Sequence, residues 1–390
     1  MWGLRLLTLG LPWAVWPGIE NPYLEPKAFL LTVLGWGLVC WRAFRVPMVP
    51  SGNWRNPWTV WVAGWVVGVS CWHFQWQFLL RSPGQAQVVY NHHVWMACVA
   101  VLMALLLARD LATGWLRTEL DLLRLTQWMV WAGTLAAAYA CAQALSFDQW
   151  FFPTAAGSIA ENRIFAAFGN PGYLAIYLAL LLPLCFLFSA RRYLVYAALM
   201  GIAIWLTGCR YAWAIAGVGL GASVLARWWT RLPRWGQWVA ALASVSLLLM
   251  LGAYAWNYVQ TDERWGLWTR ILPLLTSTVE RRALCMTGYG LDSLRLLLGS
   301  PMDYAHNEWL QMAVEIGLIG TGLLLAMVCW SVRAGWQHAT RSMVVSGWFG
   351  VWIGFLAASV IHFPAHLAPI AWVGLCAWAV MERDEGVSYG

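Results

Sequence analysis

Charged residues are scarce in this chain of 390 residues, of which they make up only 11%. Lysine is almost missing, since Lys27 is the only lysine among 24 basic residues. A soluble domain has about 25% charged residues, so the sequence does not suit a single water-facing domain. A disordered chain is excluded as well, because disorder requires high net charge and few apolar residues.

Motifs for nucleotide and metal chemistry are also missing. The sequence contains no GxxxxGK[ST] phosphate loop, no HExxH motif and no DxD motif beside a cytoplasmic fold. Its nine cysteines are scattered singly, without the paired spacing of a metal site. We therefore expect no metal and no cofactor, and we expect neither ATP-driven transport nor nucleotide-sugar chemistry inside the cell.

Apolar residues are abundant, at 61% of the chain, and 32 residues are tryptophan, a residue enriched at membrane interfaces. A run of about 20 apolar residues spans a bilayer as a helix. We therefore predict an all-α, polytopic integral membrane protein with about twelve transmembrane helices. The expected spans lie near residues 4–18, 28–44, 57–79, 89–108, 125–145, 172–189, 193–208, 211–226, 236–255, 308–330, 344–362 and 367–381.

The distribution of basic residues predicts the orientation of these spans. Cytoplasmic loops carry an excess of arginine and lysine. With both termini in the cytoplasm, fifteen of the 24 basic residues fall on that side. The long polar segments 146–171 and 256–307 then lie on the outer side, where 256–307 is expected to cap the protein. We divide the chain into N-terminal helices, about five, over 1–155 and a catalytic region over 156–390.

Two arginines stand at the expected outer edge of the membrane. Arg163 lies shortly before a helix that we expect Asn170 to cap and Pro171 to open. Arg210 follows Thr207-Gly-Cys in a connection so short that it is held near membrane depth. An ionisable group there costs about 2.5–3.5 kcal/mol on insertion scales, which makes it a functional candidate. The alternative is that each arginine extends to the lipid headgroups.

A third candidate region combines glycines with a histidine. Gly288 and Gly290 flank one tyrosine, and glycine allows a close approach of the backbone to a ligand. His306 and Asn307 precede the next span, and Asn307 and Gln311 lie one helical turn apart. Histidine can accept a proton near neutral pH. The alternative for His306 is a helix cap or a headgroup contact.

Two further features of the outer side are given other roles. His362 and His366 flank Pro364 in the last outer turn, and we expect them to serve packing or the interface, with lining of the cavity as the alternative. Several tryptophans are candidates to roof a sugar site, because aromatic faces stack on sugars; these are Trp256, Trp265, Trp268 and Trp309.

Taken in order, four motifs resemble those of the O-antigen ligase and polymerase superfamily of bacterial membrane glycosyltransferases. They are Arg163-Ile-Phe-x-x-Phe-Gly-Asn-Pro-Gly172, Thr207-Gly-Cys-Arg210, Gly288-Tyr-Gly290 and Ala305-His-Asn-x-x-Leu-Gln-x-x-x-Glu-x-Gly-Leu-Ile-Gly320. The similarity is strongest over residues 160–320. Cys209 departs from the pattern, because the family usually has serine before this arginine.

The resemblance implies a metal-independent, inverting enzyme of the bacterial inner membrane with its active site facing the periplasm. Members of the family transfer a glycan from a polyprenyl diphosphate, such as undecaprenyl diphosphate, to an acceptor hydroxyl. On this pattern Arg210 and His306 are catalytic: Arg210 neutralises the leaving diphosphate and His306 accepts the proton of the hydroxyl. The substrate-binding residues would be Arg163, Arg270, Arg281, Arg282, Asn170, Asn307, Gln311, Gly288 and Gly290.

The acceptor is left open by the sequence. We expect O-antigen ligation to lipid A-core, which belongs to lipopolysaccharide biosynthesis. A polymerase that extends a glycan and an enzyme that glycosylates protein hydroxyl groups are alternatives within the family. A lipid or solute transporter is the alternative from a different class. Membrane lipids are expected partners, and nucleic acid is not.

Overall fold

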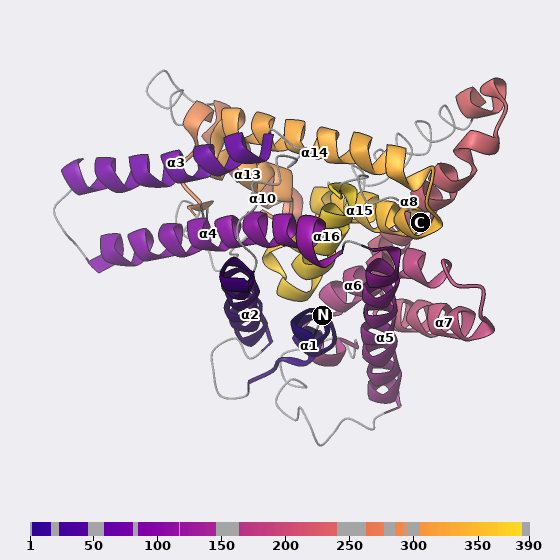
Figure 1. The fold of residues 1–390 in the computed structure, drawn as a ribbon. Coiled ribbons are helices and arrows are strands. Elements are labelled where there is room, and N and C mark those ends of the chain that lie inside the picture. Colours follow the sequence, from indigo (N-terminus) through magenta and orange to yellow (C-terminus); the bar gives the residue numbers. More distant parts are fainter. Residues whose placement is uncertain are drawn as a thin grey trace.

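The structure is a computed structural model that describes residues 2–16, 23–45, 58–80, 85–116, 118–145, 164–239, 263–276, 285–291, 293–294 and 305–383. Every regular element in these ranges is a helix and none is a strand (Figure 1). The expected all-α class is therefore confirmed for the described part of the chain.

Most expected spans coincide with a helix. The expected span 236–255 lies almost entirely outside the described residues. The principal helices are α1 (Trp2–Gly10), α2 (Glu25–Arg45), α3 (Trp58–Leu80), α4 (Gln85–Asp110), α5 (Glu119–Ala144), α6 (Pro171–Cys185), α7 (Arg191–Leu206), α8 (Arg210–Trp228), α10 (Glu263–Thr276), α13 (Glu308–Glu315), α14 (Gly317–Ala339), α15 (Met343–Ile361) and α16 (Ala368–Met381). Short turns of helix include η1 (Leu11–Trp13), η2 (Leu111–Trp115), η4 (Ala166–Phe168), η5 (Trp229–Arg231) and η6 (Pro364–His366).

Among the residues that the structure describes, three helical segments are long and apolar enough to cross a membrane. They are Ala97–Trp115, which joins the end of α4 to η2, and the helices Gly317–Ala339 and Met343–Ile361. Shorter apolar helices accompany them at Trp58–Val69, Pro171–Cys185 and Ala368–Met381. Their length and composition support association of the protein with a membrane.

Two expected spans have a different form in the structure. The span near 4–18 is replaced by α1, whose nine residues extend only about 14 Å before η1 begins. The span near 308–330 is broken into α13 and α14 at Gly317, which has a φ of 72°. There the Nε1 of Trp65 donates to the carbonyl of Ile316 over 2.8 Å. The break is therefore stabilised by contacts with distant segments that the local sequence does not reveal.

The helices of the bundle meet at two opposite ends, and the candidate site lies at one of them. At one end the hydroxyl of Ser342, before α15, lies 3.4 Å from the Glu119 carboxylate at the start of α5. Trp229 and Trp336, near the ends of α8 and α14, contact each other with ring centroids 5.1 Å apart. The other end brings together the starts of α6, α8 and α13 and the end of α15. The central helix α6 is buried between these elements.

Lys27 connects the N-terminal helices to this second end. Its side chain is only 1% exposed, and its Nζ donates to three carbonyl oxygens. These belong to Ala14 at 2.9 Å, Tyr23 at 2.8 Å and Ala167, in η4, at 2.8 Å. A lysine ammonium has three N–H donors, so one side chain satisfies three backbone acceptors. Lys27 thus fixes η4, which directly precedes the start of α6.

Replacing Lys27 by methionine is expected to lower the free energy of unfolding by about 3 kcal/mol, because three carbonyls, one buried and two half-buried, lose their donor. Thermal unfolding of the purified protein, followed by circular dichroism, measures the effect. Thr32→Ala in the same helix is the control, since Thr32 donates only to an exposed carbonyl one turn away. Equal unfolding temperatures for the two variants would contradict the bracing role of Lys27.

Candidate functional site

Aromatic rings join the second common end of the helices into one cluster. His306, just before α13, lies with its ring centroid 4.9 Å from Phe363 and 5.5 Å from His362. His362, at the end of α15, in turn lies 5.5 Å from Tyr173 in α6 and 6.2 Å from Tyr211 in α8. Four segments far apart in the sequence therefore meet around His362 and Phe363.

The starts of α6 and α8 are in direct contact. Asn170 caps α6 as expected, because its Oδ1 accepts a hydrogen bond of 2.7 Å from the N–H of Gly172, and Pro171 opens the helix. A side chain at Gly172 would collide with the hydroxyl of Tyr211. A larger residue at this position would displace the Tyr211 side chain, and the contact keeps Asn170 close to the beginning of α8.

Arg210 is the first residue of α8 and is exposed. It directly precedes Tyr211, which contacts His362, so Arg210 and His306 belong to the same end of the bundle. The N-cap residue of α8, Cys209, forms no side-chain cap hydrogen bond. The N–H groups at a helix start carry a partial positive charge, which adds to that of a guanidinium. The start of α8 thus offers two sources of attraction for an anion.

His306 has a left-handed backbone, with a φ of 51°. This region is uncommon for residues other than glycine, although histidine is among those that tolerate it. Contacts on both sides of Ala305 hold the conformation. The Nε1 of Trp268 donates to the Ala305 carbonyl over 2.7 Å, and the Ala305 N–H donates to Oε1 of Gln311 over 3.3 Å. Such sparsely populated conformations occur preferentially at functional sites.

Besides Asn170, four predicted substrate-binding residues have structural contacts of their own. Asn307 caps α13, where its Oδ1 accepts from the N–H of Leu310 over 2.9 Å. Gln311 is fully buried within a side-chain network. Gly288 and Gly290 have positive φ values of 87° and 100°. The backbone around these glycines packs on the end of α13. Their conformational freedom therefore allows the two backbones to approach closely.

The contact between the glycine segment and α13 is made by the backbone. The N–H groups of Tyr289 and Gly290 donate to the carbonyls of Val314 and Glu315, each over 2.9 Å. A Cβ atom at Gly288 would collide with the Glu315 carbonyl and with the N–H of Gly317. The same contact therefore explains both the glycine motif and the break between α13 and α14.

The described part of the structure does not bring the other predicted diphosphate-binding arginines to this cluster. Arg270 lies on α10 and is exposed, with its Nε 3.4 Å from the carbonyl of Gly266 in the same helix. Arg163, Arg281 and Arg282 lie outside the described residues. Their expected contact with a diphosphate stays a prediction.

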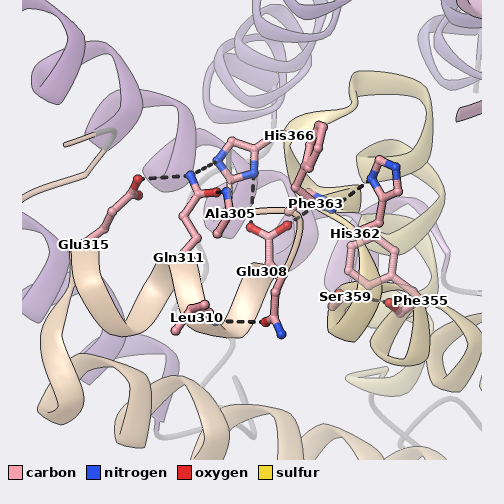
Figure 2. A network of polar contacts seen from close by, with 12 residues as sticks. Ala305, Glu308, Leu310, Gln311, Glu315, Phe355, Ser359, His362, Phe363 and His366 are labelled. Atoms are coloured by element: carbon pink, nitrogen blue, oxygen red, sulfur yellow. Dashed lines mark hydrogen bonds and ion pairs between the residues drawn. The ribbon is translucent and has the colours of Figure 1, made fainter. Parts of the chain in front are cut away.

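Three polar residues that line the cluster were not predicted as site residues. Glu308 was not singled out, and His362 and His366 were expected in packing or interface roles, with lining of the cavity as the alternative. In the structure His366 Nδ1 lies 3.2 Å from Oε1 of Glu308, and both adjoin Gln311 (Figure 2). The sequence feature that could have indicated this network is the pair of histidines, His362 and His366, that flank Pro364. Within the described ranges no three histidine, cysteine, aspartate or glutamate residues are placed to hold a metal ion.

A scan of the sequence against protein-family models finds no match, and no curated protein is found to be similar to it. The function is therefore inferred from the motifs and from the contacts among them.

Proposed function

We propose that the protein is a membrane glycosyltransferase that moves a glycan from a polyprenyl diphosphate to an acceptor hydroxyl. The observation that supports this most is the ring contact chain from Tyr211, beside Arg210, through His362 to His306. It joins the cation suited to a diphosphate and the base suited to a hydroxyl at one end of the helices. The left-handed backbone of His306 is a second, independent support.

In the proposed reaction the acceptor oxygen attacks the anomeric carbon of the donor sugar. The bond from that carbon to the diphosphate oxygen breaks, and its electron pair leaves with the polyprenyl diphosphate. His306 takes the proton of the acceptor hydroxyl. Arg210 and the start of α8 stabilise the charge that develops on the leaving diphosphate. Attack from the side opposite the leaving group inverts the anomeric configuration.

The proposed location follows from the charges at the two ends of the helices. The end that contains Glu119 and Ser342 also contains the starts of α5 and α7 and the ends of α8 and α14. Its arginines are those assigned to the cytoplasm by the positive-inside rule, among them Arg191, Arg192, Arg227 and Arg341. We accordingly propose about twelve spans, cytoplasmic termini, and a site on the periplasmic side of a bacterial inner membrane.

The purified protein is expected to transfer a radiolabelled glycan from undecaprenyl diphosphate to lipid A-core, giving a labelled lipopolysaccharide band on a gel. Parallel reactions offer a second donor molecule, for polymerisation, or a protein substrate, for protein glycosylation. The acceptor that becomes labelled identifies the activity among the three related ones. Absence of transfer to all three acceptors, with an intact protein, would contradict the proposal. Movement of the labelled donor across a vesicle membrane without transfer would instead favour a transporter.

A further inference from the structure

Four polar side chains from α13 and η6 form a connected network (Figure 2). Glu308, Gln311 and Glu315 project from α13, and His366 belongs to η6 in the turn between α15 and α16. Gln311 and Glu315 are almost fully buried, and Glu308 is 8% exposed. Buried polar groups need defined partners, so the direction of each hydrogen bond can be deduced.

The orientation of Gln311 is set by a backbone donor. Its Oε1 lies 3.3 Å from the N–H of Ala305, and only an oxygen can accept from that group. The amide nitrogen Nε2 must therefore face the other way. It lies 3.0 Å from Oε1 of Glu315 and 3.3 Å from Nε2 of His366. With two N–H donors, the amide can donate to both.

The orientation of Gln311 determines the protonation of His366. Because His366 Nε2 faces an amide donor, it must accept, and a neutral ring then carries its proton on Nδ1. That nitrogen lies 3.2 Å from Oε1 of Glu308, whose second oxygen accepts from the N–H of Ala365 over 3.3 Å. The carboxylate of Glu308 thus favours the same tautomer that Gln311 requires.

His362 shows the opposite arrangement four residues earlier. Its Nδ1 accepts from the N–H of Phe363 over 3.1 Å, so its proton is on Nε2. Both rings contact Phe363, which also packs on His306. The neighbouring histidine therefore provides an internal reference for the tautomer of His366.

We propose that His366 and Glu308 are positioning residues for His306. They hold the amide of Gln311 so that its oxygen faces Ala305, and Trp268 holds the carbonyl on the other side of that residue. The hydrogen bonds with Gln311 and Trp268 thus form a clamp on Ala305, and the strained backbone of His306 follows directly after it. The inference rests on the proposed function, because His306 has a reaction to perform only if the protein transfers a glycan.

Exchange of the amide and the carboxylate tests the clamp. Gln311→Glu places an oxygen against Glu315 and against the accepting nitrogen of His366, and it is expected to lower kcat by about 10–100-fold, as misplacement of a reacting group does. The KM for the donor is expected to change less than about threefold, since donor binding is retained. In the double variant Gln311→Glu/Glu315→Gln, the new amide at position 315 donates a hydrogen bond to the new carboxylate at position 311. The double variant also allows a protonated His366 to lie between two carboxylates, and kcat is expected to recover to within about fivefold of the original value.

Gln237→Glu is the matched control at the opposite end of the bundle. Gln237 donates to the carbonyls of Trp229 and Leu232, over 3.1 and 3.3 Å, so its loss also removes two amide contacts. This control is expected to lower thermal stability without changing kcat. An unchanged kcat in Gln311→Glu, or no recovery in the double variant, would overturn the positioning role.

A second measurement is independent of transfer. Nuclear magnetic resonance of the protein labelled with ¹⁵N-histidine is expected to show a Nδ1-protonated ring that disappears in His366→Asn, and a Nε2-protonated ring for His362. Protonation of His366 on Nε2 would overturn the deduced network. If the original protein transfers no glycan but shows both tautomers, the proposed function fails while the network stands.

Discussion

Arg210→Ala is expected to reduce kcat/KM for glycan transfer by about 100-fold or more, with the folded protein retained. Arg210 is exposed at the first position of α8, so its removal takes away little packing. A positioned cation stabilises the leaving diphosphate most strongly in the transition state, and loss of one such group typically costs about 2.7–4 kcal/mol. The rate of product formation at several donor concentrations measures the effect.

Two variants separate this role from a general loss of positive charge. Arg227→Ala removes an exposed arginine from the other end of the same helix and is expected to leave kcat/KM unchanged. Arg210→Lys keeps the charge but cannot bind a phosphate through two parallel N–H groups, so an intermediate activity is expected. Full activity of Arg210→Ala would remove this residue from the site and with it the main support for a diphosphate donor.

The sequence was most informative where local rules decide the structure. The Asn170–Pro171 helix start followed from cap chemistry, and the structure confirms it. Apolar runs located most helices to within a few residues, because a helix that is apolar throughout can be recognised from its own sequence. Helix α1 shows the limit of that rule, since Pro12 and the η1 turn end a run that is apolar enough to continue.

The parts that sequence reasoning missed depend on contacts between distant residues. The segment Gly317-Leu-Ile-Gly320 is compatible with an unbroken helix, and the break depends on Gly288, which arrives from another part of the chain. Glu308 and His366 are likewise separated along the chain by three helices, α13, α14 and α15. The carbonyl partners of Lys27 also come from three separate segments. No local pattern encodes such pairings.

Trp268 illustrates an intermediate case. Its position suggested a sugar-stacking role, which stays a prediction, and the structure shows a hydrogen bond from its indole N–H to the Ala305 carbonyl. A buried or half-buried indole normally finds such an acceptor. The sequence therefore placed Trp268 near the candidate site without revealing that it supports the backbone of the candidate base.

Substitution of His306 is expected to lower kcat by about 100- to 10,000-fold, the range for loss of a general base, with a smaller effect on donor binding. The backbone complicates the choice of variant, because His306 has a φ of 51°. Alanine in the left-handed region costs roughly 1–2 kcal/mol, so His306→Ala combines a chemical loss with backbone strain. Asparagine tolerates this region and glycine adopts it freely.

Comparison of the three variants therefore separates proton transfer from backbone geometry. His306→Asn and His306→Gly are expected to lose kcat as fully as His306→Ala. All three lose the ring contacts with Phe363 and His362, and His306→Ala, which adds backbone strain, is expected to unfold at the lowest temperature of the three. Binding of the labelled donor, measured without acceptor, is expected to persist in all three. If His306→Asn or His306→Gly retained kcat, His306 would not be the base. Loss of donor binding alone would instead assign His306 to recognition of the donor, and the proton acceptor would have to be sought elsewhere in the ring cluster around Phe363.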